Sequence, residues 1–222
     1  RTMAPKLLLA LLLLTVVGAE AVRTPDTTRY YRSPHPVSAG GGAAPGPIDP
    51  RPNWQDYPRM ARWLAHTNVW GVMGTKSVKR DGLPWTNVVD VSDGALCNST
   101  GHLFFYLTTM DETAADAQVN PKVSFTVTEA SIGGGCGGTD AEDPTCARLI
   151  VVGDLKIIPE GTPQATFALS ALEARHPAIK DWPPTHGFHP YELHIESLNL
   201  LDFYGGMKTV SVQDYFNVTL TC

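Results

Sequence analysis

The sequence has few of the features that mark several large classes of protein. It has only four cysteines in 222 residues, too few for a miniprotein held together by disulfides. Its 17 basic residues are outnumbered by 22 acidic ones, which argues against a nucleic-acid binder, because phosphate contact needs a clustered basic face. It has no apolar run of 18 residues, so no membrane-spanning helix is expected. What remains is one globular domain, or at most two small ones.

The first residues have the pattern of a secretory signal. Lys6 gives a positive start, residues 7–17 are apolar apart from one threonine, and residues 19–21 form a small-x-small cleavage site. We therefore expect a signal peptide over residues 1–21, with Arg1-Thr2 as upstream residues. A membrane anchor is the alternative, but this apolar stretch, at about 1.5 Å per residue, spans only about half of the hydrocarbon core.

Residues 22–53 are rich in proline and glycine and poor in aliphatic side chains. Such a segment cannot bury enough surface to offset its ordering entropy. We interpret it as a flexible arm, with a propeptide that is later removed as the open alternative. The folded domain is expected over residues 54–222.

Export would make glycan attachment and disulfide formation possible in this domain. Two Asn-x-Ser/Thr triplets, at Asn98 and Asn217, become predicted glycan sites. In an oxidising compartment the four cysteines can form two bridges, and three connectivities are possible.

The hydrophobic pattern predicts an α+β domain built on an antiparallel barrel. Strands are expected at residues 68–78, 86–91, 102–107, 122–128, 147–157 and 191–203. A short amphipathic helix opens the domain near Tyr57, and a second is capped by Thr162 and ends by Arg175. On the last strand, Glu192, His194 and Glu196 are expected to form a solvated polar face.

A glycine-rich stretch at residues 132–139 can be interpreted in two ways. Such stretches can cradle phosphate, but here Asp140, Glu142 and Asp143 follow and would repel an anion. The favoured interpretation is a loop closed by a Cys136–Cys146 bridge.

No catalytic or metal-binding constellation stands out. His186 and His189 have a usable spacing, but no set of three or four metal ligands is evident. No Gly-x-Ser-x-Gly nucleophile elbow is present. The carboxylates that could form an acid/base pair are not held together by any pattern, and they are Asp90, Asp93, Asp111 and Glu112.

Long, ordered motifs carry a resemblance to a known family. They are Arg175-His176-Pro177-x-x-Lys180-x-Trp182-Pro183-x-x-His186, residues 201–206 and residues 215–219, with shorter matches at residues 61–63, 66, 70–71, 92–94, 105–107 and 120–121. With these motifs the chain resembles the CREG family of secreted glycoproteins over about residues 57–219.

The resemblance implies a fold and an absence of catalysis. It implies a six-stranded antiparallel split β-barrel with flanking helices, of the FMN-binding, pyridoxamine-phosphate-oxidase type, in a homodimer. No flavin, other cofactor or metal is expected. A loop would fill the flavin pocket, and by position its tip is Asp140, Ala141, Glu142, Asp143 and Pro144. Acidic groups in place of an anionic phosphate agree with that expectation.

Two cysteines, Cys97 and Cys222, fall outside the family pattern and form a tentative second pair. The function implied is a secreted, or endosomal and lysosomal, glycoprotein. Its glycans would be bound by a sorting receptor such as a mannose-6-phosphate receptor, and its surface would bind partners in growth or differentiation. The alternative is an FMN-dependent oxidoreductase of the same fold, because fold alone does not set activity.

Overall fold

The computed structural model of the chain describes residues 50–133 and 135–221, and these belong to one compact unit. The expected signal peptide over residues 1–21 lies outside the described residues. So does the expected arm over residues 22–53, apart from its last four positions. Within the described part of the chain, no helix combines the length and the apolar character needed to cross a membrane.

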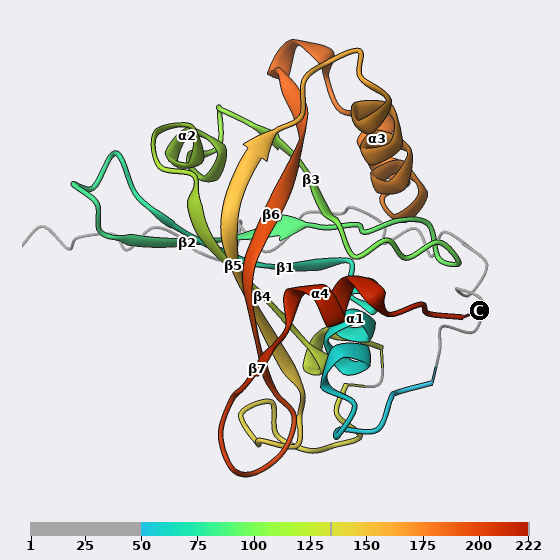
Figure 1. The fold of residues 1–222 in the computed structure, drawn as a ribbon. Coiled ribbons are helices and arrows are strands. Elements are labelled where there is room, and N and C mark those ends of the chain that lie inside the picture. Colours follow the sequence, from blue (N-terminus) through green and yellow to red (C-terminus); the bar gives the residue numbers. More distant parts are fainter. Residues whose placement is uncertain (1–49, 134, 222) are drawn as a thin grey trace, which may run out of the picture. The chain divides into compact units, whose positions relative to one another are not determined.

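One antiparallel sheet organises the described residues (Figure 1). Its strands are β1 (Trp70–Lys76), β2 (Pro84–Asp90), β3 (Leu103–Thr108), β4 (Lys122–Thr128), β5 (Arg148–Ile157), β6 (Phe188–Leu201) and β7 (Lys208–Val210). The order is β2-β1-β4-β5-β6-β3, and β7 pairs with β6 off this path. All six predicted strands are confirmed. The seventh was not predicted, because a three-residue strand is too short to show an alternating pattern.

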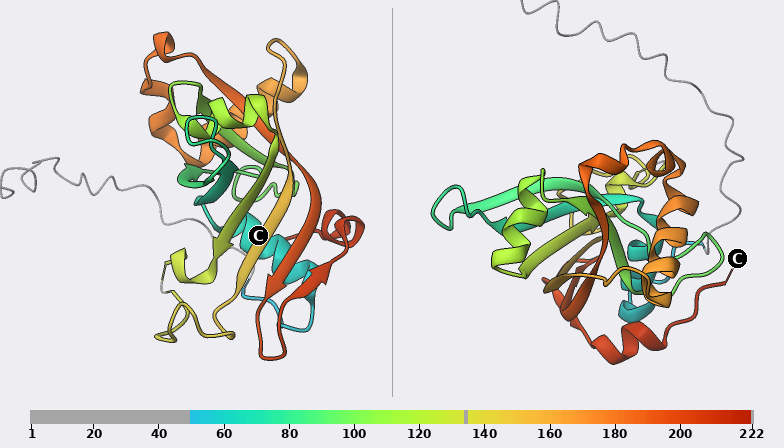
Figure 2. Two further views of the ribbon diagram at one scale, coloured as in Figure 1. Left: turned by 90° about the vertical axis from the view of Figure 1, so that its left-hand side faces the viewer. Right: turned by 90° about the horizontal axis from the view of Figure 1, so that it is seen from above.

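Helices pack around this sheet and at its ends. The α-helices are α1 (Tyr57–Thr67), α2 (Glu112–Val119), α3 (Pro163–Arg175) and α4 (Val212–Asn217). The short 3₁₀ turns of the described residues are η2 (Glu129–Ser131), η3 (Pro177–Asp181) and η4 (Pro184–His186). The predicted cap of α3 is confirmed, since the Thr162 side chain accepts the backbone N–H of Ala165. The turn between β1 and β2 projects on the side away from α4 (Figures 1 and 2).

The core lies between the inner face of the sheet and α1. Along β4, Val123, Phe125 and Val127 are buried, while the residues between them are half-buried. Met60 and Leu64 of α1 are fully buried in the same cluster. Each such side chain contributes roughly 1.5–3 kcal/mol of hydrophobic stabilisation.

A β-bulge bends the longest strand pair. The register between β5 and β6 shifts between Val152 and Gly153. A Cβ atom at Gly153 would lie 2.1 Å from the carbonyl oxygen of His194, so no larger residue fits there without a backbone shift. The bulge lets the strand pair curve, as a half-barrel requires.

The predicted polar face of β6 needs a correction. His194 and Glu196 are exposed as expected, but Glu192 is buried. Its carboxylate lies 2.6 Å from Nδ1 of His102 and accepts a hydrogen bond from Gln164 of α3. The alternation of β6 was predicted correctly, whereas the cover supplied by α3 could not be seen from the strand itself.

Candidate functional site

The turn that carries the first predicted glycan site is held from inside by Asp93. Its carboxylate accepts hydrogen bonds from the Ser99 hydroxyl (2.6 Å) and from the backbone N–H of Gly101 (3.1 Å). Nδ1 of His66 lies 2.5 Å from its other oxygen. Asp93 is buried, whereas Asn98 in the same turn is exposed. The turn therefore presents the Asn98 side chain outward from a well-anchored base.

The second predicted glycan site is attached to the same base through Arg62. This buried guanidinium donates to the Ser99 hydroxyl (2.8 Å) in the turn and to the backbone oxygen of Tyr215 (2.9 Å) in α4. The Tyr215 hydroxyl returns a bond to the backbone oxygen of Gly101 (2.9 Å), and burial raises the pKa of this phenol. Asn217 is the last residue of α4 and is exposed. Both triplets thus lie on elements that share one buried hydrogen-bond network.

The cysteines outside the glycine-rich loop are only partly described. Cys97, in the turn that carries Asn98, is disulfide-bonded. Its predicted partner, Cys222, lies outside the described residues.

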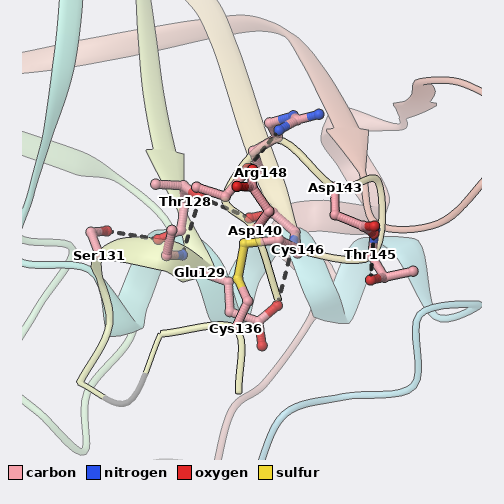
Figure 3. Close-up of a disulfide and its surroundings, with 12 residues drawn as sticks. Thr128, Glu129, Ser131, Cys136, Asp140, Asp143, Thr145, Cys146 and Arg148 are labelled. Carbon is pink, nitrogen blue, oxygen red and sulfur yellow. Dashed lines mark hydrogen bonds between the residues drawn. A yellow bond between two sulfur atoms is a disulfide. The ribbon is translucent and has the colours of Figure 1, made fainter. Parts of the chain in front are cut away.

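The predicted bridge between Cys136 and Cys146 is present, with 5.3 Å between the Cα atoms (Figure 3). The loop that it closes is ordered by its own acidic residues. Asp143 accepts the backbone N–H (2.8 Å) and the hydroxyl (2.7 Å) of Thr145, and these bonds lower the pKa of the Asp143 carboxyl. Arg148 donates to the backbone oxygens of Ala141 (2.8 Å) and Glu142 (2.9 Å).

This loop lies at one end of the sheet, and α2 lies at the other (Figures 1 and 2). The register shows why: Lys122, next to α2, pairs with Asp154, whereas Thr128, next to the loop, pairs with Arg148. Seven residues of β4 separate the two ends, about 23 Å of strand. Residues 140–144 line none of the five cavities described below, so their expected role as a pocket filler stays a prediction.

The cavity at the α2 end does not fit the phosphate of flavin mononucleotide. It has a volume of about 260 Å³, and its lining includes Asn87, Asp90, Thr108 and Asp111 together with Tyr106 and Trp182. A helix N-terminus commonly attracts phosphate, but here Asp111 caps α2 by accepting the backbone N–H of Thr113 (2.7 Å). None of the described residues that line this cavity has a basic side chain. A bound phosphate would therefore face carboxylates without a balancing cation.

Four further cavities are lined by described residues, and each lacks room or available positive charge. Lys156 lines one of about 410 Å³, but its ammonium lies 3.6 Å from the Asp154 carboxylate. Arg59 lines another of about 510 Å³ and pairs with Asp56 at 3.6 Å. A third, of about 290 Å³, contains the His189–Glu160 pair. The fourth, of about 10 Å³, is too small for a flavin.

The other candidate groups remain apart or serve structural roles. No group of three or more histidine, cysteine or carboxylate side chains that could hold a metal ion occurs among the described residues. Asp93 anchors a turn and Asp111 caps a helix, whereas Asp90 lies 3.6 Å from His176. Glu112 pairs with Lys79 at 3.1 Å, so these contacts assemble no acid/base pair from the four predicted carboxylates.

One buried charge cluster was missed by the sequence analysis. Arg51 donates to Glu129 (2.7 Å) and also pairs with Asp202, which is almost fully buried. Burial raises the pKa of Asp202 to about 6 in spite of the opposing charge of Arg51. The only signal in the sequence was an aspartate directly after an apolar strand. Its partner Arg51 lies 151 residues away in the chain, beyond any local pattern.

The chain is similar in sequence to known proteins over most of its length. The family model described as "CREG, beta-barrel" matches residues 52–217. The chain is 31% identical to mouse Protein CREG1, over 83% of this chain and 87% of that one. It is 37% identical to human Protein CREG2, over 80% of this chain and 60% of that protein.

Solved structures agree on the fold. A heme-binding protein from Mycobacterium smegmatis superposes with a TM-score of 0.57 at 20% identity, covering 75% of this chain and 61% of that one. The Agrobacterium tumefaciens protein Atu2129, of unknown function, gives 0.57 at 22% identity, covering 78% and 65%. At such identities the likeness concerns the split-barrel fold alone. On the family model and the relatives together, the chain belongs to the CREG family.

Proposed function

We propose that this protein is a secreted, endolysosomal glycoprotein whose split barrel binds partner proteins and catalyses no reaction. The observation that carries the proposal is the cavity at the α2 end. Its helix N-terminus is capped by Asp111, and it has no basic lining residue. Carboxylates without a balancing cation would leave the cofactor phosphate in this cavity without the anchor that flavin chemistry needs. The partners are proposed to act in control of growth or differentiation, in line with the CREG resemblance.

The test is flavin binding by the purified protein. The expected result is a visible spectrum without flavin absorption and no uptake of added FMN in equilibrium dialysis. Riboflavin, which lacks the phosphate, serves as the second ligand. Tight binding of FMN would overturn the proposal. Uptake of riboflavin alone would show that the cradle is open and that only the phosphate is rejected, which would overturn the idea of a filled pocket.

Glycans on Asn98 and Asn217 are proposed as the groups that a sorting receptor binds. Both side chains are exposed, and their elements are joined through Arg62. Treatment with a glycosidase should increase mobility on a gel, in two steps that Asn98→Gln and Asn217→Gln remove one at a time. Retention on an immobilised mannose-6-phosphate receptor should be lost in the double variant and on addition of free mannose 6-phosphate. Unchanged mobility in every case would contradict glycan attachment.

A homodimer is proposed on the outer face of β1 and β2. Trp70, Val72 and Val88 are 39%, 37% and 60% exposed there, and Val72 lies directly opposite Val88. Because the loop over residues 140–144 is at the far end of β4, it would have to fill the cradle of the partner copy. Sedimentation should show a dimer that Val88→Asp weakens, whereas Val78→Asp in the projecting turn should not. A wild-type monomer would contradict the proposal.

A further inference from the structure

An aromatic cavity lies where the first described residues meet the turn between β6 and β7. Trp54 stacks on Phe203 with 4.4 Å between ring centroids, and Tyr204 meets Phe203 edge-on at 5.4 Å. Tyr57 completes the aromatic lining. The volume is about 10 Å³, room for one group the size of a water molecule.

Beside this cavity lies a carboxylate with one oxygen that has no hydrogen-bond partner among the described residues. Asp202 lines the cavity, and its side chain is only 2% exposed. Its Oδ1 pairs with Arg51, whereas its Oδ2 is shielded from solvent and has no hydrogen-bond partner among the described residues. A buried acceptor without a donor costs about 1–3 kcal/mol, and more when it is charged. The site therefore lacks one hydrogen-bond donor.

The local charge is also unbalanced. Among the described residues, Arg51 is the single cation that contacts the two buried carboxylates of Glu129 and Asp202, which leaves one net negative charge. Aromatic ring faces attract cations, and they do so more strongly when water is excluded. The missing donor should therefore carry a positive charge.

Size selects among the organic cations. A primary ammonium has about the dimensions of a water molecule and carries three N–H donors. A guanidinium or a trimethylammonium is larger than the available space. The neighbouring Gly205 and Gly206 both have positive φ values, and Tyr204 is 61% exposed. This glycine turn borders the cavity, so the alkyl stem of a ligand would pass beside it.

We propose that this cavity binds a primary ammonium group carried on an alkyl chain, with Asp202 as the ion-pair partner and Trp54 and Tyr204 as the flanking rings. Two sources share this chemistry: the side chain of a lysine in a peptide and a free alkylamine. The proposal is independent of the absence of flavin chemistry.

Lys208 is the rival occupant, because it also lines the cavity. Its side chain is exposed, and no ion pair links it to Asp202 among the described residues. A swing of this lysine into the cavity would satisfy Asp202 from within the chain. The variant Lys208→Met separates the two possibilities, since it removes the internal ammonium and keeps the alkyl stem.

The experiment follows the indole N–H resonance of Trp54 in ¹⁵N-labelled full-length protein, assigned with Trp54→Phe. n-Butylammonium chloride is titrated against sodium chloride and n-butanol as controls, and an N-acetylated, C-amidated Gly-Gly-Lys-Gly-Gly peptide is the second probe. A saturable shift with n-butylammonium at pH 7.5 is expected, with affinity lower by about tenfold or more in Asp202→Asn. Tyr204→Ala should also weaken binding. Asp181→Asn, at an exposed carboxylate, should leave it unchanged.

Acid gives a second readout. Because burial raises the pKa of Asp202 to about 6, affinity should fall about tenfold between pH 7.5 and pH 5.0 in the wild type, but not in Asp202→Asn. Tighter binding of the lysine peptide than of n-butylammonium would assign the site to a protein partner, and the reverse to a free amine. Absence of a saturable shift in the wild type would overturn the proposal. So would an equal shift in Asp202→Asn, or binding that appears only in Lys208→Met.

Discussion

Two buried aspartates, Asp93 and Asp202, stand in opposite relations to their surroundings. Both are 5% exposed or less, and both face an arginine. Asp93 has donors at both oxygens, whereas Asp202 has one oxygen without a partner. Fully satisfied buried charges fix a local structure, while partly satisfied ones leave capacity for a ligand or a proton. We infer that Asp93 maintains the fold and that Asp202 is available to a binding partner.

Removal of the Asp93 carboxylate should have the largest effect. Asp93→Ala would leave Arg62 and His66, both 2% exposed, without their acidic partner. The free energy of unfolding, measured by urea denaturation, should fall by about 3–5 kcal/mol. Asp181→Ala, at an exposed site, should change it by less than about 0.5 kcal/mol. A loss as small as that of the control would mean that Asp93 is not the anchor of the turn.

Removal of the Asp202 carboxylate should instead raise the free energy of unfolding when the ligand is absent. Its folded pKa of about 6 lies above the ordinary value of 3.8, so its contribution to stability is complete below pH 3.8 and is lost as pH rises through 6. Asp202→Asn removes this loss. The variant should gain on the wild type by up to about 3 kcal/mol between pH 4 and pH 7.5, as measured by urea denaturation across that range. A difference independent of pH would contradict the raised pKa.

A smaller change sharpens the first half of the comparison. Tyr215→Phe deletes the hydroxyl that donates to the Gly101 backbone oxygen and keeps the buried ring. The free energy of unfolding should fall by about 0.5–1.5 kcal/mol. Hydrogen exchange should also become faster at the backbone amides of the turn that carries Asn98. Faster exchange elsewhere, with none in this turn, would show that the hydroxyl does not hold it.

Local patterns predicted the elements that carry their own signal. The bounds of β4 are those of the predicted segment, because its alternation is uninterrupted from Lys122 to Thr128. The start of α3 was readable from Thr162 and Pro163. The helices α2 and α4 were missed because they have only eight and six residues. Short helices of that kind depend on packing more than on their own pattern.

The candidate sites that have a local sequence signal could likewise be predicted, and those that depend on distant residues could not. The bridge between Cys136 and Cys146 was predicted because its cysteines close a short loop, and the exposure of Asn98 agrees with a glycan site. The burial of Glu192 and Asp202 depends on Gln164 and Arg51, which are distant in the sequence. A single sequence carries no record of such long-range pairs, so the burial of these two carboxylates could not be predicted.

The guanidinium that joins the Asn98 turn to α4 also has a consequence for how the molecule can be approached. If glycans are attached at both triplets, the two glycans lie close together and cover the same surface of the protein. A large partner protein would be sterically excluded from that surface and would have to bind elsewhere. The turn of the hairpin between β1 and β2 projects on the side away from α4 (Figures 1 and 2). By joining the two glycan-bearing elements, Arg62 would help to determine which surface of the protein is accessible to partners.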